Sequence, residues 1–320
     1  MEEPWRTVGR AEYRRDERVK MNLACAANPI GKRCMRKFGK VLLVTVLVLL
    51  SVAFVFVGGV YALSARRLNR HHTVLAVPVG IPEGQGSVAR GAHLVATRGC
   101  ADCHGADLGG AKVVENPAIG RMHGPNLTKG AGGVTANYQE EDWVRSIRHG
   151  INPKGWPLVL MPSHEYAEMS DQDFADLIAY LKSVPPVDRE TVPVSVGPVA
   201  RLLILTGEMR LAAEVIDHTG LRPSTVQPGV TPEYGRYLAA GCTGCHGPNY
   251  SGGKIAGGPP EWPAASNLTA GEMGAMKNWT ESDFMTALKT GHRPNGTEIN
   301  PVMPRAFGKM TEEEMKALWS

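Results

Sequence analysis

The chain combines one long uncharged stretch with many short segments in which apolar residues recur at helical spacing. From Val41 to Ala65 no residue carries a charge. About 20 apolar residues are enough to cross the hydrocarbon core of a bilayer as a helix, and a helix of a soluble protein rarely stays apolar on every side for that long. The stretch therefore predicts a transmembrane anchor over residues 41–65, followed by a linker over residues 66–84.

Positive charge on the two flanks indicates how this anchor is oriented. Five basic residues precede it: Lys32, Arg33, Arg36, Lys37 and Lys40. Three follow it closely: Arg66, Arg67 and Arg70. Because basic residues collect on the cytoplasmic side, we expect residues 1–40 to form a basic cytoplasmic tail. The remainder of the chain is then expected on the periplasmic, outer face of the cytoplasmic (inner) membrane.

A cleaved signal peptide is the alternative interpretation, with Ala62–Ser64 as a small-residue cleavage site. The apolar stretch is longer than the roughly 7–15 residues of a signal peptide, which favours an uncleaved anchor. Met35 begins a sequence, MRKFGKVLLV, that looks like a complete start of such a segment. Residues 1–34 are therefore either a mis-start or a short tail. Their cysteines, Cys25 and Cys34, have no histidine nearby and are interpreted as incidental.

The rest of the sequence repeats itself at an almost constant offset. The pentapeptide CADCH at Cys100 returns as CTGCH at Cys242, and PNLT at Pro125 returns as SNLT at Ser266. Further matched pairs are Gly150 and Gly291, Met161 and Met303, and Met169 and Met310. The offset changes by one residue only in Gly/Pro-rich stretches, where loops absorb insertions. We interpret this pattern as a tandem duplication.

Each copy predicts a few helices joined by long irregular loops. Thr280 begins a capping box with Asp283, and Gly291 ends the apolar stripe that follows. The last helices begin at Ser170 and Thr311, each with an acid three residues later. No alternating strand pattern competes with these signals. We therefore expect an all-α fold with two tandem domains behind a single membrane helix.

The duplication also sets the expected domain boundaries. The first domain covers residues 85–186 and the second covers residues 229–320. A strap of residues 187–228 joins them, and because its apolar run Leu202–Leu205 is far too short to span a membrane, we expect it to pack against one or both domains. By comparison with ADLIAYLKSV in the first copy, the chain stops at Ser320 part-way through the last helix. The second domain is therefore expected to be less stable.

Composition and charge refine this picture only a little. Residues 1–70 hold 14 Lys/Arg against 5 Asp/Glu, whereas residues 71–320 hold 21 against 26. The basic residues are not interleaved with aromatic ones, so we expect no binding to nucleic acid. A domain of about 100 residues rich in Gly and Pro has a thin core. We therefore expect something other than apolar side chains to help stabilise the fold of each copy.

The Cys-x-x-Cys-His pentapeptide is the attachment signature for c-type haem. The two thiols form thioether bonds to the porphyrin, and the next histidine donates an imidazole nitrogen to the iron. The residues concerned are Cys100, Cys103 and His104 in the first copy, and Cys242, Cys245 and His246 in the second. The spacing fits one helical turn, which projects the three side chains to one side.

Three alternative roles for the cysteine pairs account for less of the pattern. Disulfides within each pair can form outside the cytoplasm, but they do not explain the histidines. A zinc site built from both pairs would need a gap of about 15–20 residues between them, whereas here the pairs belong to different repeats. A thioredoxin-type redox motif requires a βαβ context, which the sequence does not predict.

A methionine follows each pentapeptide at the same distance, which marks a candidate sixth ligand. Met161 follows Cys100 at the same spacing as Met303 follows Cys242, and each methionine directly precedes a proline, which favours a stiff loop. Methionine is also a common core filler. Other methionines lack a counterpart or directly precede a helix start: Met122, Met273, Met276, Met169 and Met310. His149 and His292 occupy neighbouring but unequal repeat positions, which weakens them as paired ligands.

With the pentapeptide, GPNLT and Met-Pro in the same order, each copy resembles a class I cytochrome c domain. The chain resembles a membrane-anchored dihaem cytochrome c over roughly residues 85–320. It is similar to the cytochrome c subunits that accompany membrane-bound alcohol, aldehyde and gluconate dehydrogenases, although those subunits carry three haems.

The resemblance implies two covalently attached haem c groups and a ligand set for each iron. The proximal ligands are His104 and His246, and the distal ligands are Met161 and Met303. The resemblance also implies that the carbonyl of Pro125 accepts a hydrogen bond from the proximal imidazole, which fixes its tautomer. Ser266 occupies that position in the second copy, and its carbonyl could serve equally.

His/Met ligation leaves no open coordination position at the iron, which favours electron transfer over chemistry at the metal. We therefore expect a membrane-tethered carrier of single electrons and not an enzyme. Its partners would be a dehydrogenase or a quinol-oxidising complex on one side, and a terminal oxidase or soluble acceptor on the other. The alternative is a dihaem cytochrome c peroxidase, which needs one iron that can lose its distal ligand. A haem-based sensor would need a signalling domain, for which the tail is too short.

Overall fold

The computed structural model describes residues 29–255, 257–259 and 261–320. The chain divides into two compact units, with the boundary after Gly59. The part of the predicted tail formed by residues 1–28, including Cys25, lies outside the described residues, as does the side chain of Cys34.

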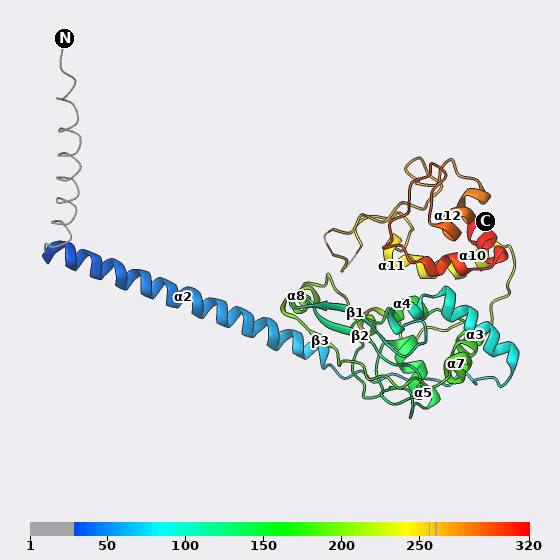
Figure 1. The fold of residues 1–320 in the computed structure, drawn as a ribbon, viewed down its shortest axis with the longest axis horizontal. Helices are drawn as coiled ribbons and strands as arrows, with labels where there is room; N and C mark the ends of the chain where they lie inside the picture. Colours follow the sequence, from blue (N-terminus) through cyan, green and yellow to red (C-terminus); the bar gives the residue numbers. More distant parts are fainter. Residues whose placement is uncertain (1–28, 256, 260) are drawn as a thin grey trace, which may run out of the picture. The chain divides into compact units, whose positions relative to one another are not determined.

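A single long helix contains the predicted anchor. Helix α2 runs over Pro29–Leu68 (Figure 1) and therefore extends beyond the uncharged stretch at both ends. It is the one helix among the described residues that is long and apolar enough to cross a membrane. Its apolar side chains, including Leu49, Phe54 and Val55, are exposed. The helix is thus a candidate membrane anchor.

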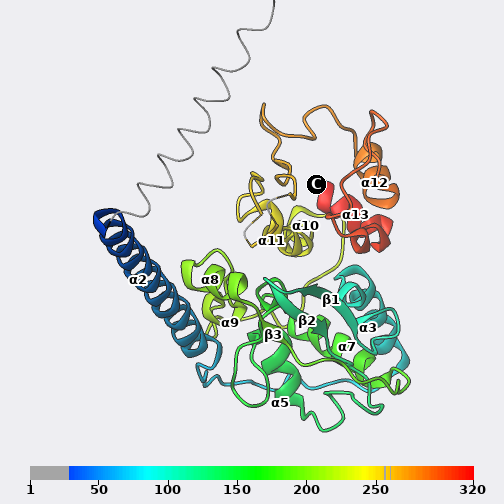
Figure 2. The same cartoon turned by 60° about the vertical axis from the view of Figure 1, so that its left-hand side comes forward.

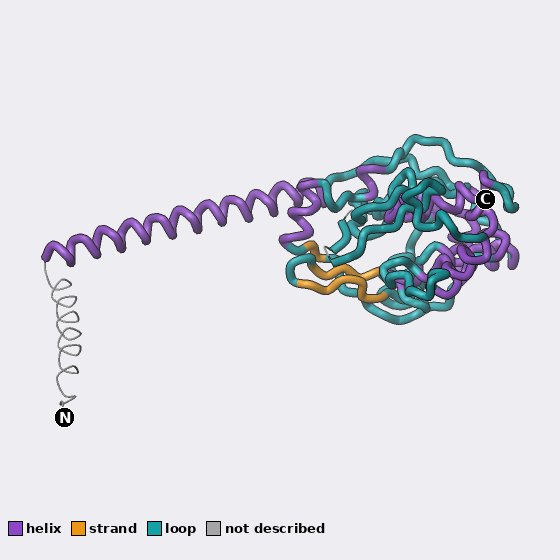
Figure 3. The backbone as a smooth tube through the Cα atoms, turned by 90° about the horizontal axis from the view of Figure 1, so that it is seen from above, coloured by secondary structure: helices purple, strands orange, loops and turns teal. Residues whose placement is uncertain are grey.

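The first repeat is mostly helical. Its elements are α3 (Gln85–Thr97), α4 (Cys100–His104), β1 (Ala111–Asn116), β2 (Gly120–Gly124), α5 (Glu140–Trp143), the π-helical turn η1 (Val144–Arg148), α6 (Ser163–Tyr166) and α7 (Asp171–Ser183). Helix α7 begins as predicted, because the side chain of Ser170 accepts a hydrogen bond from the backbone N–H of Asp173. Loops take up much of the chain between these elements (Figure 3).

The second repeat follows the same order of helices without strands among its described residues. Its elements are α10 (Pro232–Ala239), the 3₁₀ turn η2 (Ala240–Cys242), α11 (Thr243–His246), α12 (Glu281–Thr290), η3 (Arg305–Lys309) and α13 (Glu312–Trp319). Both capping boxes form as the sequence predicts, with Thr280 paired to Asp283 and Thr311 paired to Glu314.

In both repeats the first and last helices cross at a glycine. Gly91 of α3 lies so close to the carbonyl of Asp176 in α7 that there is no room for a Cβ atom. Gly235 of α10 lies in the same way against the carbonyl of Ala317 in α13. A larger residue would push the helix backbones apart. These glycines identify α3 with α10, and α7 with α13, as equivalent pairs.

The two repeats differ in how many apolar side chains they bury. The core of the first repeat contains Leu94, Val95, Leu108, Trp143, Val144, Ile147, Tyr166, Met169, Phe174, Leu177, Ile178 and Leu181, joined by Ala76 of the preceding linker. The buried cluster of the second repeat contains Tyr234, Leu238 and Ala317. The first repeat therefore has a conventional apolar core, whereas the second has a small one.

A three-stranded antiparallel sheet corrects the all-α prediction. Strands β1 and β2 pair as a hairpin, and the short strand β3 (Ser195–Val196) of the strap adds to the other edge of β2 (Figure 2). A register irregularity between Lys112 and Val114 interrupts the alternation of β1, which removes the usual strand signal from its sequence. Strand β3 is very short and depends on a partner much earlier in the chain.

The strap contacts the first repeat along much of its length. Its helices are α8 (Pro198–Thr206) and α9 (Ala212–Val215). The side-chain amide of Asn126 donates a 2.7 Å hydrogen bond to the carbonyl of Val187, and the backbone N–H of Arg189 donates to the carbonyl of Ala131. At the other end of the strap, Arg222 donates to the carbonyl of Ala167.

The repeats contact each other through reciprocal hydrogen bonds. His93 of α3 lies 2.7 Å from the carboxylate of Glu314 in α13. In the opposite direction, the hydroxyl of Tyr237 in α10 donates a 2.8 Å bond to Asp173 in α7. The two donors are equivalent, because His93 and Tyr237 each lie two positions after the crossing glycine of their repeat. The two acceptors are also equivalent, because Asp173 and Glu314 are the third residues of α7 and α13. Arg90 contacts both carboxylates.

Candidate functional site

Each Cys-x-x-Cys-His pentapeptide forms a helical turn that is followed by a glycine with positive φ. In the first repeat the pentapeptide is α4, and it is preceded by Gly99 with φ 72° and followed by Gly105 with φ 80°. In the second repeat it spans the end of η2 and α11 and is followed by Gly247 with φ 76°. A positive φ is readily adopted by glycine and costly for other residues. The glycine after each histidine therefore ends the helical turn that presents the two cysteines and the histidine.

The histidine of each turn is buried and oriented by a backbone carbonyl. The Nδ1 atom of His104 lies 2.9 Å from the carbonyl oxygen of Pro125, and the Nδ1 atom of His246 lies 2.7 Å from that of Ser266. Because a carbonyl oxygen can only accept, Nδ1 carries the proton in both rings and Nε2 keeps a free lone pair. Burial lowers the pKa of His104, although the bond to Pro125 partly opposes this shift. A neutral, oriented imidazole is what a metal ligand requires.

The four motif cysteines are free thiols in the structure, so they do not form the disulfides that were one alternative. Burial raises the pKa of Cys100 to about 12 and that of Cys242 to about 11. Throughout the described ranges, no group of three His, Cys, Asp or Glu side chains is placed to hold a metal ion. The geometry therefore does not favour a zinc site.

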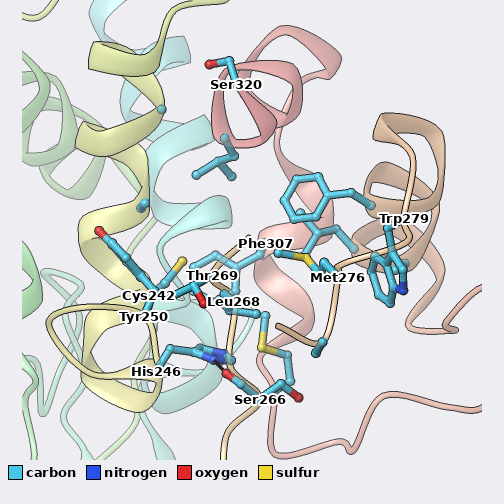
Figure 4. A pocket seen from close by; sticks show the side chains of 18 of the residues that line it. Cys242, His246, Tyr250, Ser266, Leu268, Thr269, Met276, Trp279, Phe307 and Ser320 are labelled. Carbon is cyan, nitrogen blue, oxygen red and sulfur yellow. Dashed lines mark hydrogen bonds between the residues drawn. The ribbon is translucent and has the colours of Figure 1, made fainter. Parts of the chain in front are cut away.

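An apolar cavity adjoins the motif of the second repeat. Its volume is about 370 Å³, within the range of about 300–1,000 Å³ typical of cofactor sites. Cys242, His246 and Met303 line it. The other lining side chains are mainly apolar and include Leu268, Trp279, Phe284, Leu288, Ile299 and Phe307. Figure 4 shows His246 beside Ser266 on one side of this cavity. The mainly apolar walls fit a large apolar cofactor, which His246 and Met303 would contact.

A second cavity, of about 420 Å³, shares five lining residues with the first: His246, Ser266, Arg293, Ile299 and Met303. His246 and Met303 line both cavities, and Cys245 lines the second one. The sequence did not single out Met276 as a ligand, yet it also lines the first cavity and is labelled in Figure 4. Its position makes it a useful control for Met303, because both residues line the same space.

In the first repeat, the corresponding residues lie against the apolar core. Cys100 and Met161 are partly buried and both pack against the core cluster, together with Leu127 and Tyr138. Thus the structure brings the first cysteine and the predicted distal methionine of this repeat to one apolar cluster, although they are far apart in the sequence.

The two histidines that competed with the methionines do not occupy equivalent environments. His149 is buried, and its Nδ1 lies 2.9 Å from Nδ1 of His218. Burial, with smaller effects from His218 and nearby arginines, lowers the pKa of His149 to about 4. His292 is exposed. Within the described structure, the one hydrogen-bond partner of its side chain is the carbonyl of Thr290. They are therefore not a matched pair of ligands.

Sequence reasoning did not find the contacts between each pentapeptide and the other repeat. Gly244, inside CTGCH, lies against the carboxylate of Glu165, which follows Met161-Pro162 in the first repeat. Gly99, just before CADCH, lies near Ala306, which follows Met303-Pro304 in the second repeat. Burial raises the pKa of Glu165 to about 7, and the charge of Arg98 opposes this shift.

Arg98 is a buried cation at this junction between the repeats. The residue is 7% exposed, and its guanidinium donates a long bond of 3.4 Å to the carbonyl of Leu238. The same guanidinium lies 5.8 Å from the ring centroid of Tyr237. No signal in the sequence could have revealed this environment, because these contacts join residues of different repeats.

A repeated Cys-x-x-Cys-His turn with a carbonyl-bound histidine defines the class of c-type haem proteins. The family model for cytochrome c matches residues 88–185 and 233–320. These matches cover more than half of the chain, which therefore belongs to the cytochrome c family. This membership confirms the resemblance inferred from the motifs, implies covalently bound haem c, and identifies an electron-transfer protein.

Several characterised proteins are similar to this chain. A diheme cytochrome c-type protein of Cereibacter sphaeroides is 28% identical over 261 residues, which cover 73% of this chain and 84% of that protein. The fructose dehydrogenase cytochrome subunit of Gluconobacter japonicus is 27% identical over 68% of this chain and 47% of the subunit. For the gluconate 2-dehydrogenase cytochrome c subunit of Pantoea cypripedii, the identity is 27% over 70% of this chain and 54% of the subunit. The chain thus spans about half the length of these two subunits.

Proposed function

We propose that this chain is a membrane-tethered dihaem c-type cytochrome that carries single electrons. The observation that carries the proposal is the matched pair of sites. Each site has a Cys-x-x-Cys-His turn, a histidine whose Nδ1 is fixed by a carbonyl, and a Met-Pro at the same spacing from the first cysteine. A bound haem c supplies a reversible one-electron couple at each site.

Different residues would attach each haem and coordinate its iron. Thioether bonds would come from Cys100 and Cys103 in the first repeat, and from Cys242 and Cys245 in the second. The free Nε2 atoms of His104 and His246 would be the proximal ligands. Met161 and Met303 would be the distal ligands. Proline after each methionine restricts the backbone of the loop. The methionine side chain is therefore held in place although it does not lie in a helix.

The proposed ligand sets would close the coordination of both irons, which favours electron transfer over catalysis at the metal. If His104 and Met161 hold one iron, and His246 and Met303 the other, no coordination position would be open to a substrate. The second candidate is a dihaem peroxidase. In such an enzyme one of the two methionines would have to dissociate from its iron so that peroxide could bind. At the second site, Met303 lines the same cavity as His246, which supports a site held by both side chains and therefore a carrier.

The relatives and the anchor suggest where the electrons come from. Two of the similar proteins are named as cytochrome subunits of fructose and gluconate dehydrogenases, which supports a dehydrogenase as donor, with a quinol-oxidising complex as the other candidate. A terminal oxidase or soluble acceptor would receive the electrons. We assign residues 41–65 as the anchor in the cytoplasmic membrane, with the haem domains on the periplasmic side. Tethering raises the effective concentration of a carrier near its membrane partners.

Redox titration with absorption spectroscopy tests the ligand assignment. In Met161→Ala and Met303→Ala, we expect loss of the methionine–iron charge-transfer band for one haem and a lower reduction potential for that haem, because methionine ligation raises the potential. Met276→Ala is the matched control and should keep both bands. If Met161→Ala and Met303→Ala behave like the parent protein, the ligand assignment is wrong. Rapid turnover of peroxide by the reduced parent protein would instead support the peroxidase.

A further inference from the structure

Helix α8 belongs to neither cytochrome c domain. The family matches end at residue 185 and resume at residue 233, and α8 (Pro198–Thr206) lies between them with the sequence PVARLLILT. Arg201 is its one charged residue. A helix that is apolar on nearly every side is usually buried in a core or in contact with a membrane. The position of this helix therefore requires an explanation beyond the two haem sites.

One face of α8 is buried, and the opposite face is apolar but open. Ala200 and Ile204 are completely buried against the rest of the protein. Val199 and Leu202 are 43% and 39% exposed, and the neighbouring Leu203 is half-buried. These three residues have the i, i+3, i+4 spacing of a single helix face. A surface helix normally carries polar residues on such a face.

The same helix is bound to the end of the anchor helix α2. The guanidinium of Arg201 lies 4.6 Å from the ring centroid of Tyr61 and donates a 2.9 Å hydrogen bond to the hydroxyl of Ser64. Further along α2, Arg67 donates to the carbonyl of Ile204. Arg67 also pairs with Glu214 of α9, with Nε at 3.2 Å from the carboxylate. Several polar bonds therefore fix α8 to residues 61–67.

Residues 61–67 coincide with the level at which the anchor should leave the hydrocarbon. A bilayer core takes about 20 helical residues, and that length counted from Val41 ends at Val60. Tyr61 follows directly, and tyrosine is enriched at the membrane–water interface. The first charges after the span are Arg66 and Arg67. An element bound to this part of α2 lies at the depth of the lipid headgroups.

We propose that α8 is a second membrane contact, with its Val199–Leu202–Leu203 face inserted into the headgroup and acyl boundary of the lipid bilayer. The occupant of the face is lipid, because the face continues from the emerging end of the anchor. Interfacial helices of this kind bury an apolar face to a depth of about 5–10 Å. The contact would restrict rotation of the first haem domain about the anchor. This inference rests on the proposed anchoring of α2.

Site-directed spin labelling of the full-length, haem-loaded chain tests the proposal. Cys25 and Cys34 are replaced by serine so that only an introduced cysteine reacts. A nitroxide is placed at Leu202→Cys in vesicles of phosphatidylcholine and phosphatidylglycerol. We expect this label to lose most of its collisions with a water-soluble nickel chelate and to keep collisions with oxygen, which concentrates in lipid. Met273→Cys, at an 85% exposed apolar residue of the second repeat, is the matched control and should collide freely with the chelate.

A third label separates failure of this inference from failure of the anchor. At Val52→Cys, in the middle of the uncharged stretch, the label should report lipid if α2 spans the bilayer. Lipid contact at residue 52 with full water access at residue 202 overturns the role of α8 alone, whereas water access at both positions overturns the anchor as well. If residue 202 becomes shielded only when a protein partner is added, the face binds protein and the proposal is wrong.

Discussion

The two repeats carry the same motifs but are held together differently. The first repeat surrounds Cys100 and Met161 with a large apolar core, and the strap adds a strand and further hydrogen bonds. The second repeat has a small buried cluster and a cavity of about 370 Å³ between Cys242, His246 and Met303. Equal ligand spacing therefore does not mean equal scaffolds. We therefore expect the second repeat to depend more than the first on its cofactor for stability.

The loop that contains the NLT sequence after each pentapeptide shows the same contrast on a smaller scale. Asn126 is fully buried, and its side-chain amide donates to the strap carbonyls of Val187 and Arg189. The side chain of its counterpart, Asn267, makes only local hydrogen bonds in the described structure. Its oxygen accepts from the backbone N–H and the hydroxyl of Thr269. The same residue type thus joins two segments in one repeat and shapes a single turn in the other.

The largest expected effect separates the repeats by removing one haem at a time. In Cys242→Ala/Cys245→Ala, we expect the second repeat to lose its cooperative unfolding transition, which amounts to about 5 kcal/mol or more for a small domain. In Cys100→Ala/Cys103→Ala, the first repeat should retain more of its helical structure, because its core residues supply most of its contacts. Limited proteolysis and circular dichroism measure both results. Equal loss in the two variants would contradict the comparison.

A smaller effect is expected at the reciprocal contact between the repeats. Burial opposes the charge of Glu314, but hydrogen bonds from His93 and the Thr311 N–H, together with the charges of His93 and Arg90, outweigh it and lower its pKa from 4.5. Its charged form therefore stabilises the folded state fully above pH 4.5, and this contribution is lost as the pH falls through the lower folded-state pKa. Glu314→Gln should reduce the free energy of unfolding at neutral pH by about 1.5–3 kcal/mol.

The pH dependence distinguishes this contact from a general packing effect. The difference between Glu314→Gln and the parent protein should shrink below pH 4.5 in urea titrations at several pH values. The exposed neighbour Glu313 offers the control, since Glu313→Gln should leave both the stability and its pH dependence nearly unchanged. A constant difference at every pH would show that the carboxylate charge does not matter.

The smallest effect is expected at the paired asparagines. Asn126→Ala removes both hydrogen bonds from the buried Asn126 side chain to the strap carbonyls of Val187 and Arg189, so we expect it to cost about 1–3 kcal/mol of unfolding free energy. Asn267→Ala removes only a local turn bond and should cost about 0.5 kcal/mol. Thermal or urea unfolding followed at the helical signal measures both. A larger loss from Asn267→Ala than from Asn126→Ala would reverse the proposed contrast between the repeats.

Local signals in the sequence were enough to predict much of the helical fold. The caps at Ser170, Thr280 and Thr311 form as expected because each depends on residues three positions apart. The repeat likewise identified the two pentapeptides, and the family match covers both of them. The ligand roles of Met161 and Met303 stay predictions until they are tested.

Features that depend on distant partners could not be predicted in this way. Strand β3 exists through pairing with β2, and its short sequence carries no strand signal of its own. The contact of Gly244 with Glu165 joins residues that are far apart in the sequence and lie in different repeats. The π-helical turn over Val144–Arg148 directly follows the α-helix Glu140–Trp143, and no sequence pattern marks the change. In each case the three-dimensional packing, and not local propensity, determines the structure.

The reciprocal bonds between the repeats have a consequence for the origin of this architecture. His93 with Glu314, and Tyr237 with Asp173, join equivalent positions of two copies in opposite directions. A patch that meets its own equivalent is the defining property of an isologous dimer with twofold symmetry. The chain therefore contains, within one polypeptide, the kind of interface by which two separate copies of a domain would form a homodimer.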